Sequence, residues 1–511
     1  MGWSSEFIQM ISSERVTPIY VVEAVALTGS IRGTWQISTH ASYGAAIISH
    51  EGVQGSSGIE LTLRTWRTRF GSWSVMLVGD IGSFLRTVAK GQIVRMLIGF
   101  PGWPIEKFEP VALGQVWNII RAGDGYRLDV RSIQSALRTR LTTTDNENAL
   151  YDDILDSAAT NVATTNYTVG LGTLSVSSAA AIKRQDDGSG TLKGVVGVTD
   201  NSGDLFFLSF TGISGNDLTT TVGDLYGTDD AAADIGNTVF TRAYWDDHPL
   251  DMIRRVLLST GTQGGDWKWG LETWGYGLGD ALIDHTETDK WRQRSQPASG
   301  SDDWEFVATE QTNGFEWLES VIAPGGHFIT IRQGRIIGAC VLDPYRQSVT
   351  TALTITDADI DQVVTHEFWD TRLTLEYNRV IVDGENEASS GVTTTGEASA
   401  MPAESFTKVI LPHVWSNVTA IETEIGNRVA PWHLRIPERL VLVLRGWRMA
   451  QLSIGDILTV TSRRLRGRLP GTRSGYVGQR VMVTGVSTAW FGATVRVSLA
   501  TLPDFDGPFD S

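Results

Sequence analysis

The sequence predicts a mainly β, multidomain protein with an α+β region in its middle. Its 511 residues are enough for roughly three or four domains of about 100–200 residues each. Fifty-four glycines beside a charged fraction of 20% are typical of a chain with many tight turns. Alternating apolar and polar residues mark both ends of the chain, whereas the clearest helical spacing lies near its centre.

Residues 1–145 are predicted to form an N-terminal β domain. Ile59, Leu61 and Leu63 alternate with polar residues, which is the period of a strand with one buried face. Ile19–Leu27 is a further strand candidate. A small barrel or sandwich is the natural way to bury this many strands.

Two further strands of this domain are apolar on both faces, which predicts that both faces are buried: Trp73–Val78 and Gln92–Ile98. A hairpin is expected from Gln115 to Arg131, with the Asp124-Gly125 pair supplying its turn. Ile133 and Leu137 then predict a short helix that closes the domain.

Residues 146–244 are expected to form a β-rich, acidic, surface-exposed insertion. Alanine, threonine, serine, glycine and aspartate dominate it, and basic residues are few. Its first part, Asn146–Thr160, has the spacing of a helix through Leu150, Ile154 and Leu155, and a hairpin is predicted from Gly194 to Phe210.

Two aspartate-rich stretches of the insertion resemble fragments of calcium-binding loops. Asp186-Asp187-Gly188 and Asp200–Asp204 both lack the glutamate that closes a full EF-hand loop. Ordinary turn chemistry explains them better, because aspartate, asparagine, serine and glycine all favour turns.

Residues 245–345 are expected to form an α+β domain that begins with an amphipathic helix. Leu250, Ile253 and then Val256 or Leu257 recur at spacings of three and four. Asp247 is the predicted cap, Pro249 suits the first turn, and Gly261 is the predicted stop. Asp251 suits the positive end of the helix dipole.

The rest of this domain is predicted as an exposed tract, a second helix and a hairpin. Thr286–Asp303 is polar and is expected to be solvent-exposed. Helical spacing follows in the set Phe315, Leu318, Glu319 and Ile322 and stops at Pro324-Gly325-Gly326. The hairpin runs from Phe328 to Leu342 around a Gln333-Gly334 turn.

Residues 346–511 are expected to return to β structure and to end in a small antiparallel barrel. Thr374–Val382 is a predicted strand, the polar segment 385–404 a mobile loop, and Ile421–Asn427 a helical segment. The barrel strands are predicted at Leu440–Leu444, Leu458–Thr461, Arg480–Val486 and Thr494–Leu499. Ile454-Gly455-Asp456-Ile457 supplies a turn into the second of these.

Composition limits the classes of function. The formal net charge of −16 argues against a dedicated nucleic-acid-binding surface, which would show basic clustering. The one cysteine, Cys340, lies in an apolar run; a reactive thiol is the less favoured interpretation, and a small buried residue on a strand the more favoured one.

The first residues match no targeting signal. They carry no basic region or long apolar core, and Glu6 stands where a myristoylation signal needs serine or threonine. No apolar run approaches the ~18 residues of a membrane span. We therefore expect folding in a cytoplasm without cleavage.

Catalytic signatures are absent from the sequence. It has no phosphate-loop motif, zinc helix, nucleophile elbow or CxxC pair, so no catalytic, cofactor-binding or metal-binding residue is predicted and no cofactor is expected. Gly275–Gly279 resembles a dinucleotide loop only faintly, and the histidines stand singly, at no spacing typical of metal ligands.

Two clusters allow a binding or enzymatic alternative. Six of the 18 tryptophans crowd into one region, where sugar rings could stack on them: Trp267, Trp269, Trp274, Trp291, Trp304 and Trp317. Glycoside hydrolysis needs two carboxylates, and the candidates are Glu272, Asp280, Asp284, Glu305 and Glu316. The more favoured interpretation is that the tryptophans fill a core.

The second cluster is basic. Five arginines, Arg463, Arg464, Arg466, Arg468 and Arg473, lie in a glycine-bearing loop. They could contact DNA phosphates, but a solvated loop, or an interface with the acidic insertion or a neighbouring protein, is the favoured interpretation.

Four segments in a fixed order resemble tail hub proteins of tailed bacteriophages, a family that includes contractile-phage baseplate hubs and type VI secretion spikes. The segments are Gly125–Arg131 with the short helix after it; His248–Ile253 with the following Trp-Gly-Tyr-Gly-Leu-Gly run; Gly314–Leu318 through Arg332–Arg335; and Tyr377–Val380 with the later Ile454–Leu458. They cover most of the chain except 146–244.

The resemblance implies a structural, non-enzymatic protein of the virion, assembled in the host bacterial cytoplasm. In this family three subunits form a ring, to which each lends two tube-like β-barrel domains, so that a six-fold tail tube meets three-fold tip, spike or fibre parts. Genome DNA passes through the lumen without specific binding, a role that an acidic surface suits, and the host envelope is a further possible partner. The alternative is a tail protein that binds or cleaves a cell-wall glycan. A tailocin or gene transfer agent hub is a third interpretation.

Overall fold

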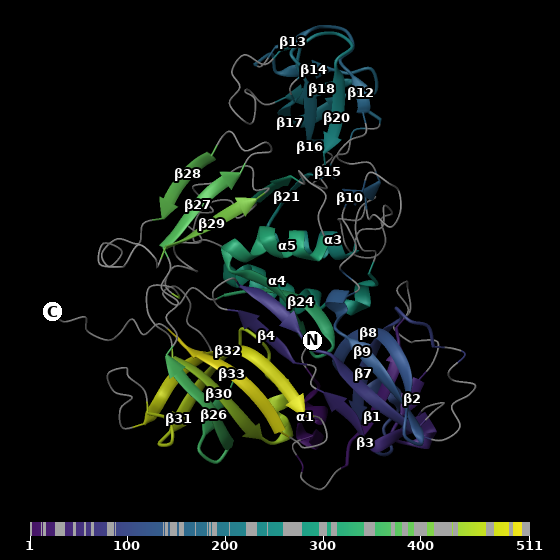
Figure 1. Ribbon diagram of the computed structural model, residues 1–511, viewed down its shortest axis with the longest axis vertical. Helices are drawn as coiled ribbons and strands as arrows, with labels where there is room; N and C mark the ends of the chain where they lie inside the picture. The colour runs from purple at the N-terminus through teal and green to yellow at the C-terminus, as the bar shows by residue number, and fades with distance from the viewer. Residues whose placement is uncertain are drawn as a thin grey trace, which may run out of the picture.

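The computed structural model describes residues between Trp3 and Leu502. The longer stretches that it leaves out are 26–35, 79–85, 144–150, 221–231, 259–277, 296–303, 342–352, 393–405, 413–431 and 467–474, with shorter gaps elsewhere. The molecule is elongated and mainly β, as predicted (Figure 1). Two barrel-like units lie side by side at one end, the helices lie in the middle, and the insertion forms the other end.

The first unit, called barrel 1 here, is a closed barrel of seven strands in the order β1-β2-β3-β6-β9-β8-β7. Their bounds are β1 Ile19–Ala24, β2 Gln36–Ser38, β3 Ile47–Gly55, β6 Trp73–Val78, β7 Ile93–Gly99, β8 Glu109–Ala122 and β9 Gly125–Arg131. Helix α1, Ser5–Ile11, packs Phe7 and Ile11 into the same core. A closed barrel leaves no unpaired strand edge.

The predicted hairpin of barrel 1 is confirmed as β8 and β9, which pair from Gln115↔Arg131 to Ala122↔Gly125. The expectation that Trp73–Val78 is buried on both faces was wrong: Trp73, Val75 and Leu77 are buried, while the residues between them are not. The outer face of β6 is not covered by another described element, whereas β7, also predicted to be buried on both faces, is buried at every residue but Arg95. After β9 the predicted short helix is a 3₁₀ turn, Ile133–Ser135.

Strands β4, Ile59–Thr62, and β5, Arg67–Phe70, leave barrel 1 and join the C-terminal sheet. That sheet, called barrel 2 here, has the strand order β25-β31-β32-β33-β30-β26, and β4 pairs with β32. The bounds are β25 Leu353–Thr356, β26 Ile360–Phe368, β30 Glu438–Arg445, β31 Ile457–Ser462, β32 Tyr476–Ala489 and β33 Thr494–Thr501. The predicted C-terminal strands are thereby confirmed, but the expectation that they form an antiparallel barrel was wrong at one pair, because β25 and β31 are parallel.

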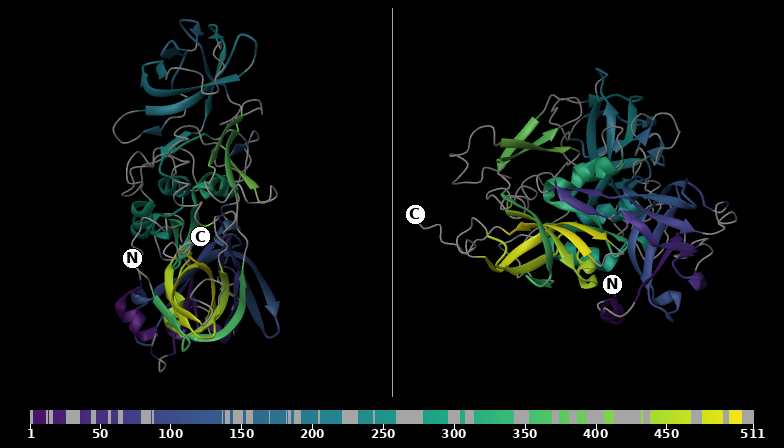
Figure 2. Two further views of the ribbon diagram at one scale, coloured as in Figure 1. Left: turned by 90° about the vertical axis from the view of Figure 1, so that its left-hand side faces the viewer. Right: turned by 60° about the horizontal axis from the view of Figure 1, so that its bottom comes forward.

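Barrel 2 curls strongly, as Figure 2 shows. Its two edge strands, β25 and β26, are joined by a short turn in which the Asp359 amide donates to the Thr356 carbonyl over 3.0 Å. This turn holds the two edges of the sheet together at one end. A 3₁₀ turn, Trp447–Gln451, follows β30 and contacts α1 of barrel 1.

The insertion forms a separate small β unit with its own core. Its main sheet follows the order β12-β20-β16-β17-β18-β14. The strands are β12 Ala158–Asn161, β14 Thr173–Ser175, β16 Leu192–Thr199, β17 Leu205–Ser214, β18 Asp217–Thr220 and β20 Thr238–Arg242, with short pairs at β10 Thr142–Thr143, β11 Tyr151–Asp152, β13 Tyr167–Thr168, β15 Gln185–Asp186 and β19 Ala232–Ala233.

The two ends of this sheet also meet. Val162 bridges Val176, and the Ala163 and Ser177 amides donate to the Ser175 and Asn161 carbonyls over 2.9 and 2.8 Å. The predicted hairpin is confirmed as β16 and β17. The helix expected in 146–160 was wrong where the chain is described: β12 is a strand because it pairs with β20. Leu150, Ile154 and Leu155 lie outside the described residues.

The middle region holds α3 Pro249–Leu258, α4 His285–Ser295 and α5 Gly314–Ile322, with strands β21 Tyr244–Asp247, β22 Trp304–Val307, β23 His327–Arg332 and β24 Arg335–Cys340. Helix α3 is confirmed, but its predicted cap was wrong. His248 occupies the cap: its Nδ1 accepts the Leu250 amide over 3.1 Å, while the Asp247 carboxylate is paired with Arg255 over 2.7 Å. Gly261 and the tryptophan and glycine run up to Gly277 lie outside the described residues.

The exposed tract predicted at 286–303 was wrong in its first part, which is helix α4. Only one face of α4 is buried, through Thr288, Trp291 and Ser295. Polar residues on that face find partners: Thr288 Oγ1 donates to the Asp284 carbonyl over 2.8 Å. Helix α5 and the β23–β24 hairpin are both confirmed.

A three-stranded sheet, β28-β27-β29, stands beside the helices (Figure 1). Its strands are β27 Thr374–Val380, β28 Glu387–Val392 and β29 Phe406–Pro412. The strand predicted from Thr374 is confirmed, whereas the mobile loop predicted at 385–404 was wrong for β28. Backbone pairing with β27 places that polar segment in a sheet. The helix predicted at Ile421–Asn427 lies outside the described residues.

Candidate functional site: the junction between the barrels

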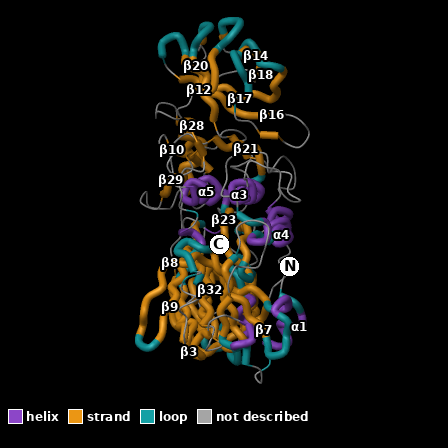
Figure 3. Tube along the Cα trace, turned by 90° about the vertical axis from the view of Figure 1, so that its right-hand side faces the viewer, coloured by secondary structure: helices purple, strands orange, loops and turns teal. Residues whose placement is uncertain are grey.

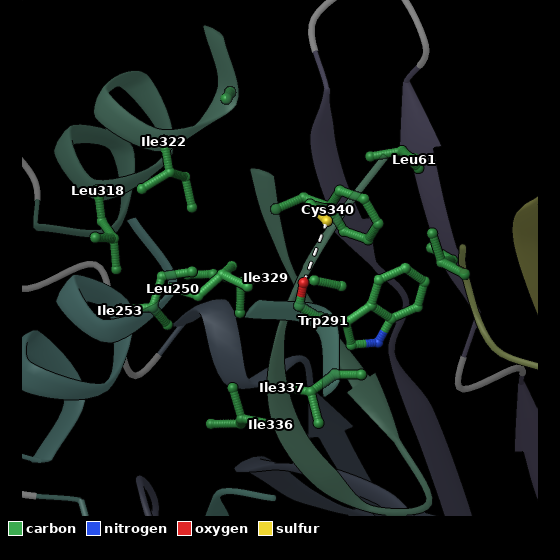
Figure 4. Close-up of a cluster of buried hydrophobic side chains, with 14 of the residues drawn as sticks. Leu61, Leu250, Ile253, Trp291, Leu318, Ile322, Ile329, Ile336, Ile337 and Cys340 are labelled. Atoms are coloured by element: carbon green, nitrogen blue, oxygen red, sulfur yellow. Dashed lines mark hydrogen bonds between the residues drawn. The ribbon is translucent and has the colours of Figure 1, made fainter. Parts of the chain in front are cut away.

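The most extensively built feature of the described chain is the junction between the two barrels. It comprises the β4–β5 hairpin, the β23–β24 hairpin, helix α4 and the turn Ser453–Asp456. One hydrophobic core extends from Leu113 and Ile133 beside barrel 1, through Phe328, to Ile454 and Met482 of barrel 2. Figure 4 shows part of this core, including Leu61, Trp291 and Ile329. A shared core fixes the units that it joins, since protein interiors are densely packed.

The β4–β5 hairpin joins the two barrels through backbone pairing. Ile59 and Glu60 pair with Val486 and Gly485 of β32. The hairpin also contacts the helices, because the Phe70 ring meets that of Phe315 edge-on at 6.4 Å. A segment that follows β3 of barrel 1 thereby forms part of the barrel 2 sheet.

Thr68 in β5 connects three elements at once. Its amide donates to Glu319 Oε1 of α5 over 3.2 Å, its hydroxyl donates to the Ile329 carbonyl of β23 over 2.6 Å, and its carbonyl accepts from Gln134 Nε2 over 2.9 Å. All three hydrogen bonds are buried or partly buried. Leaving a buried polar group without a partner would lower the stability of the fold by about 1–3 kcal/mol.

The Glu319 carboxyl is buried at this point. Burial raises its pKa from 4.5 to about 7, and the charge of Glu316 acts in the same direction. The Thr68 hydrogen bonds and the charge of Arg67 oppose the rise. Glu319 therefore changes charge near neutral pH at a place where three elements meet.

The β23–β24 hairpin is a wedge between the barrels. Its turn residues Gln333 and Gly334 have φ values of 51° and 66°, as a two-residue turn between strands requires. A Cβ atom on Gly334 would lie 2.8 Å from Pro110 Cβ of barrel 1, so the turn is pressed against that barrel. Its flank lines a cleft of about 50 Å³ together with Trp3 of barrel 1 and Leu452 of barrel 2.

Trp291 of α4 packs against barrel 2. It is 1% exposed, and a Cβ atom on Gly455 would lie 3.0 Å from its ring. Cys340 of β24 is also buried, and its Sγ lies 3.8 Å from the Trp291 carbonyl (Figure 4). The predicted buried position of this cysteine on a strand is confirmed.

A network of buried and half-buried charges surrounds this contact. Arg332 bridges Glu287 of α4, at 2.8 Å, and Asp456 of barrel 2, at 3.4 Å. Burial raises the pKa of Asp456, and the charge of Arg332 opposes that rise. Arginine suits such a position because its planar group carries several donors.

A second set of ion pairs ties α3 to α4. Arg254 lies 2.6 Å from Asp289, and Asp251 lies 2.7 Å from Arg292. His248 extends the connection: its Nδ1 is an acceptor, so its Nε2 carries the proton that is donated to Ser295 Oγ over 2.9 Å. Removing one member of a buried ion pair leaves an uncompensated charge, which is strongly destabilising.

The carboxylates predicted as glycosidase candidates do not meet as a pair among the described side chains. Asp280 lies 2.7 Å from His285, and Asp284 accepts the Glu287 amide over 3.0 Å at the start of α4. Glu272 and the side chain of Glu305 lie outside the description, as do Trp267, Trp269, Trp274 and the side chains of Trp304 and Trp317. Trp291 is a core residue.

The basic loop is described only as far as Arg466. The side chains of Arg463, Arg464 and Arg466 are exposed, and Arg464 donates to the Ile360 carbonyl over 2.9 Å. Arg468 and Arg473 lie outside the described residues. The searched, described residues hold no group of three or more metal-binding side chains, and no described helix is long and apolar enough to cross a membrane.

The sequence pattern does not predict the junction between the barrels. One signal was available: Glu319 stands at an apolar position of its helical pattern, which is unusual for a carboxylate. Thr68 gave no signal, because its partners Glu319 and Ile329 lie more than two hundred positions away along the chain.

Comparison with known proteins gives no match to any family model and none to a curated protein. Several solved structures are similar. The 43 kDa tail protein of prophage MuSo2 from Shewanella oneidensis has 10% identity and a TM-score of 0.37, covering 94% of this chain and 98% of that one. Prophage tail protein gp18 from Listeria monocytogenes EGD-e has 8% identity and a TM-score of 0.38, covering 94% of each chain.

The Francisella PdpA-VgrG complex has 5% identity and a TM-score of 0.35, covering 99% of this chain and 62% of that one. Phage tail proteins and a VgrG complex, the classes that the sequence resembles, are thus among the solved structures similar to this chain.

Proposed function

We propose that the protein is a structural hub of a phage-type tail tip or baseplate. Three copies form a ring that joins a six-fold tail tube above to three-fold tip, spike or fibre parts below. The observation that carries the proposal is the junction: the hairpin that follows β3 of barrel 1 pairs with β32 of barrel 2, and one hydrophobic core extends between the two barrels. Two barrels fixed within one subunit are what three copies need in order to present six similar units.

The chain divides according to this role. Residues 1–145 and 346–511 supply the two barrel domains, 245–345 supplies the domain between them, and 146–244 is an insertion on the outer wall. The β4–β5 hairpin lies within residues 1–145 in the sequence, but it pairs with the sheet that residues 346–511 form. No catalytic activity is part of the proposal.

The ring conducts genome DNA into the host without binding it specifically. The formal net charge of −16 supports this, because an acidic wall repels phosphates. The insertion alone carries thirteen acidic and four basic residues, a difference of −9. The protein acts in the virion after assembly in the host bacterial cytoplasm, and contact with the host envelope follows from a place at the tail tip.

Native mass spectrometry and negative-stain microscopy of the purified full chain test the proposal. The expected result is a trimer that averages to a three-fold ring. A chain that remains monomeric at high protein concentration, and also when the tube protein of the same particle is added, would contradict it. A variant with 158–242 replaced by a short linker is the control. It should keep the ring and lose only outer density, because Ala158 and Phe240 are paired neighbours.

A further inference from the structure

Barrel 1 presents one broad outer face of mixed apolar and basic character. This face, called the hairpin face here, is formed by the outward side chains of β6, β9 and β8, which are neighbours in the barrel. Its main members are Met76, Val78, Trp117, Ile120, Arg127 and Arg131. Figure 3 shows β8 and β9 extending together from the body of the molecule.

Trp117 and Val78 stand out on this face. They are 37% and 42% exposed and are the large hydrophobic residues of barrel 1 that the described structure leaves exposed. Trp117 lies at a bulge in β8, between Val116 and Asn118, which interrupts the regular pairing with β9. A bulge re-aims a side chain, and here it leaves the indole at the surface.

Two cations lie over the ring of this indole. Lys90 Nζ lies 3.8 Å from the ring centroid, and the guanidinium carbon of Arg131 lies 3.1 Å from it. Cation–π contacts of this kind hold a side chain in place at little cost. A fixed, exposed tryptophan beside arginine has the composition of a binding hot spot, in which tryptophan and arginine are enriched.

The charge of the face differs in sign from that of the chain. Four basic residues and two acidic ones lie on it or at its rim: Lys90, Arg121, Arg127 and Arg131 against Asp124 and Asp129. Asp129 is paired with Arg127 over 2.7 Å. The face is therefore locally basic on a chain whose formal net charge is −16.

The difference in charge between this face and the whole chain indicates which partner binds the face. Identical subunits of charge −16 repel one another, and a contact that sets a basic surface of one copy against an acidic surface of the next reduces this repulsion. DNA suits the face less well, because bases bind by stacking on an open aromatic ring, and two cations already lie over the ring of Trp117.

We propose that the hairpin face is the surface by which one copy of this chain binds an acidic surface of the next copy in the ring. The proposal rests on the proposed function and names the contact that the ring uses. Trp117 is its anchor, and Lys90 and Arg131 supply both the charge and the support for the indole.

The test compares charge reversals on two surfaces of the full-length chain. The first variant is Lys90→Glu with Arg131→Glu. The matched control is Arg463→Glu with Arg466→Glu, which reverses two exposed cations of barrel 2 and adds the same negative charge. Trp117→Ala tests the anchor without changing the charge. Circular dichroism and thermal unfolding confirm that each variant is folded.

Sedimentation velocity over a range of protein and salt concentrations measures the association. We expect the hairpin-face reversal and Trp117→Ala each to weaken it at least about 10-fold, with the control unchanged, and added salt to weaken the association of the wild type. Equal trimer formation in all four proteins would overturn the inference, and so would equal loss in the two reversals, which would show a general charge effect. A wild type that is monomeric throughout, and also when the tube protein is added, would instead contradict the proposed function itself, before any variant is compared.

Discussion

Glu319 makes the stability of the junction depend on pH. Its carboxyl has a pKa of about 7 in the folded chain and an ordinary value of 4.5. Below pH 4.5 the group is neutral in the folded and unfolded chain alike. Between pH 4.5 and 7 the folded chain holds a proton that the unfolded chain has released, so the free energy of unfolding falls as pH rises. At one pKa unit per 1.36 kcal/mol, the loss is at most about 3 kcal/mol.

Glu319→Gln isolates this effect. The amide oxygen can still accept the Thr68 amide hydrogen bond, but the side chain stays neutral at every pH. We expect the variant and the wild type to unfold at similar temperatures at pH 5. At pH 8 the variant should unfold at a higher temperature, by on the order of 5 °C.

The assay is thermal unfolding followed by the fluorescence of the 18 tryptophans, which include Trp66 and Trp291 in the core of the junction. Glu316→Gln is the control: it changes an exposed carboxyl of the same helix, and by removing a charge that raises the pKa of Glu319 it should move the pH response to lower pH. A difference between Glu319→Gln and the wild type that is the same at pH 5 and pH 8 would refute the reasoning.

Three further predictions concern the packing and hydrogen bonds of the junction. Trp291→Ala should cost about 3–5 kcal/mol in chemical denaturation, and a loss below about 1 kcal/mol would show that the site can collapse. Gly455 and Gly446 have φ values of 89° and 90°, but only a Cβ on Gly455 would meet Trp291. Gly455→Ala should therefore lower the unfolding temperature more than Gly446→Ala, and equal effects would exclude the contact as the cause. Thr68→Val removes the hydroxyl that donates to Ile329 and should cost about 1–2 kcal/mol; unchanged unfolding would mean that water replaces this bond.

The fold could be predicted from sequence where a buried face is apolar and regular. Leu250, Ile253 and Val256 predicted α3 because they form one apolar stripe, and all three are buried. Helix α4 has no such stripe: its buried residues are Thr288, Trp291 and Ser295. Two of these three buried residues are polar and form hydrogen bonds. Because the buried face is not an apolar stripe, the sequence pattern indicated an exposed tract.

The partner of a strand is harder to predict than the strand itself. Alternation at Ile59 and Leu61 indicated β4 correctly, but the period of a strand carries no information on which sheet it joins. The same holds for the ends of the insertion sheet, where Val162 meets Val176. For this reason the junction became visible only in the structure.

The pairing of β4 with β32 also means that this part of the sheet can form only late in the synthesis of the chain. Glu60 and Gly485 are 425 positions apart, as 485 minus 60 gives. At roughly 5–20 residues per second, a ribosome needs about 20–80 s to cover that distance. Throughout that time β4, with Ile59 and Leu61, lacks its partner strand β32. We expect the hairpin to be sheltered meanwhile, on barrel 1 or on a chaperone, until β32 has been made.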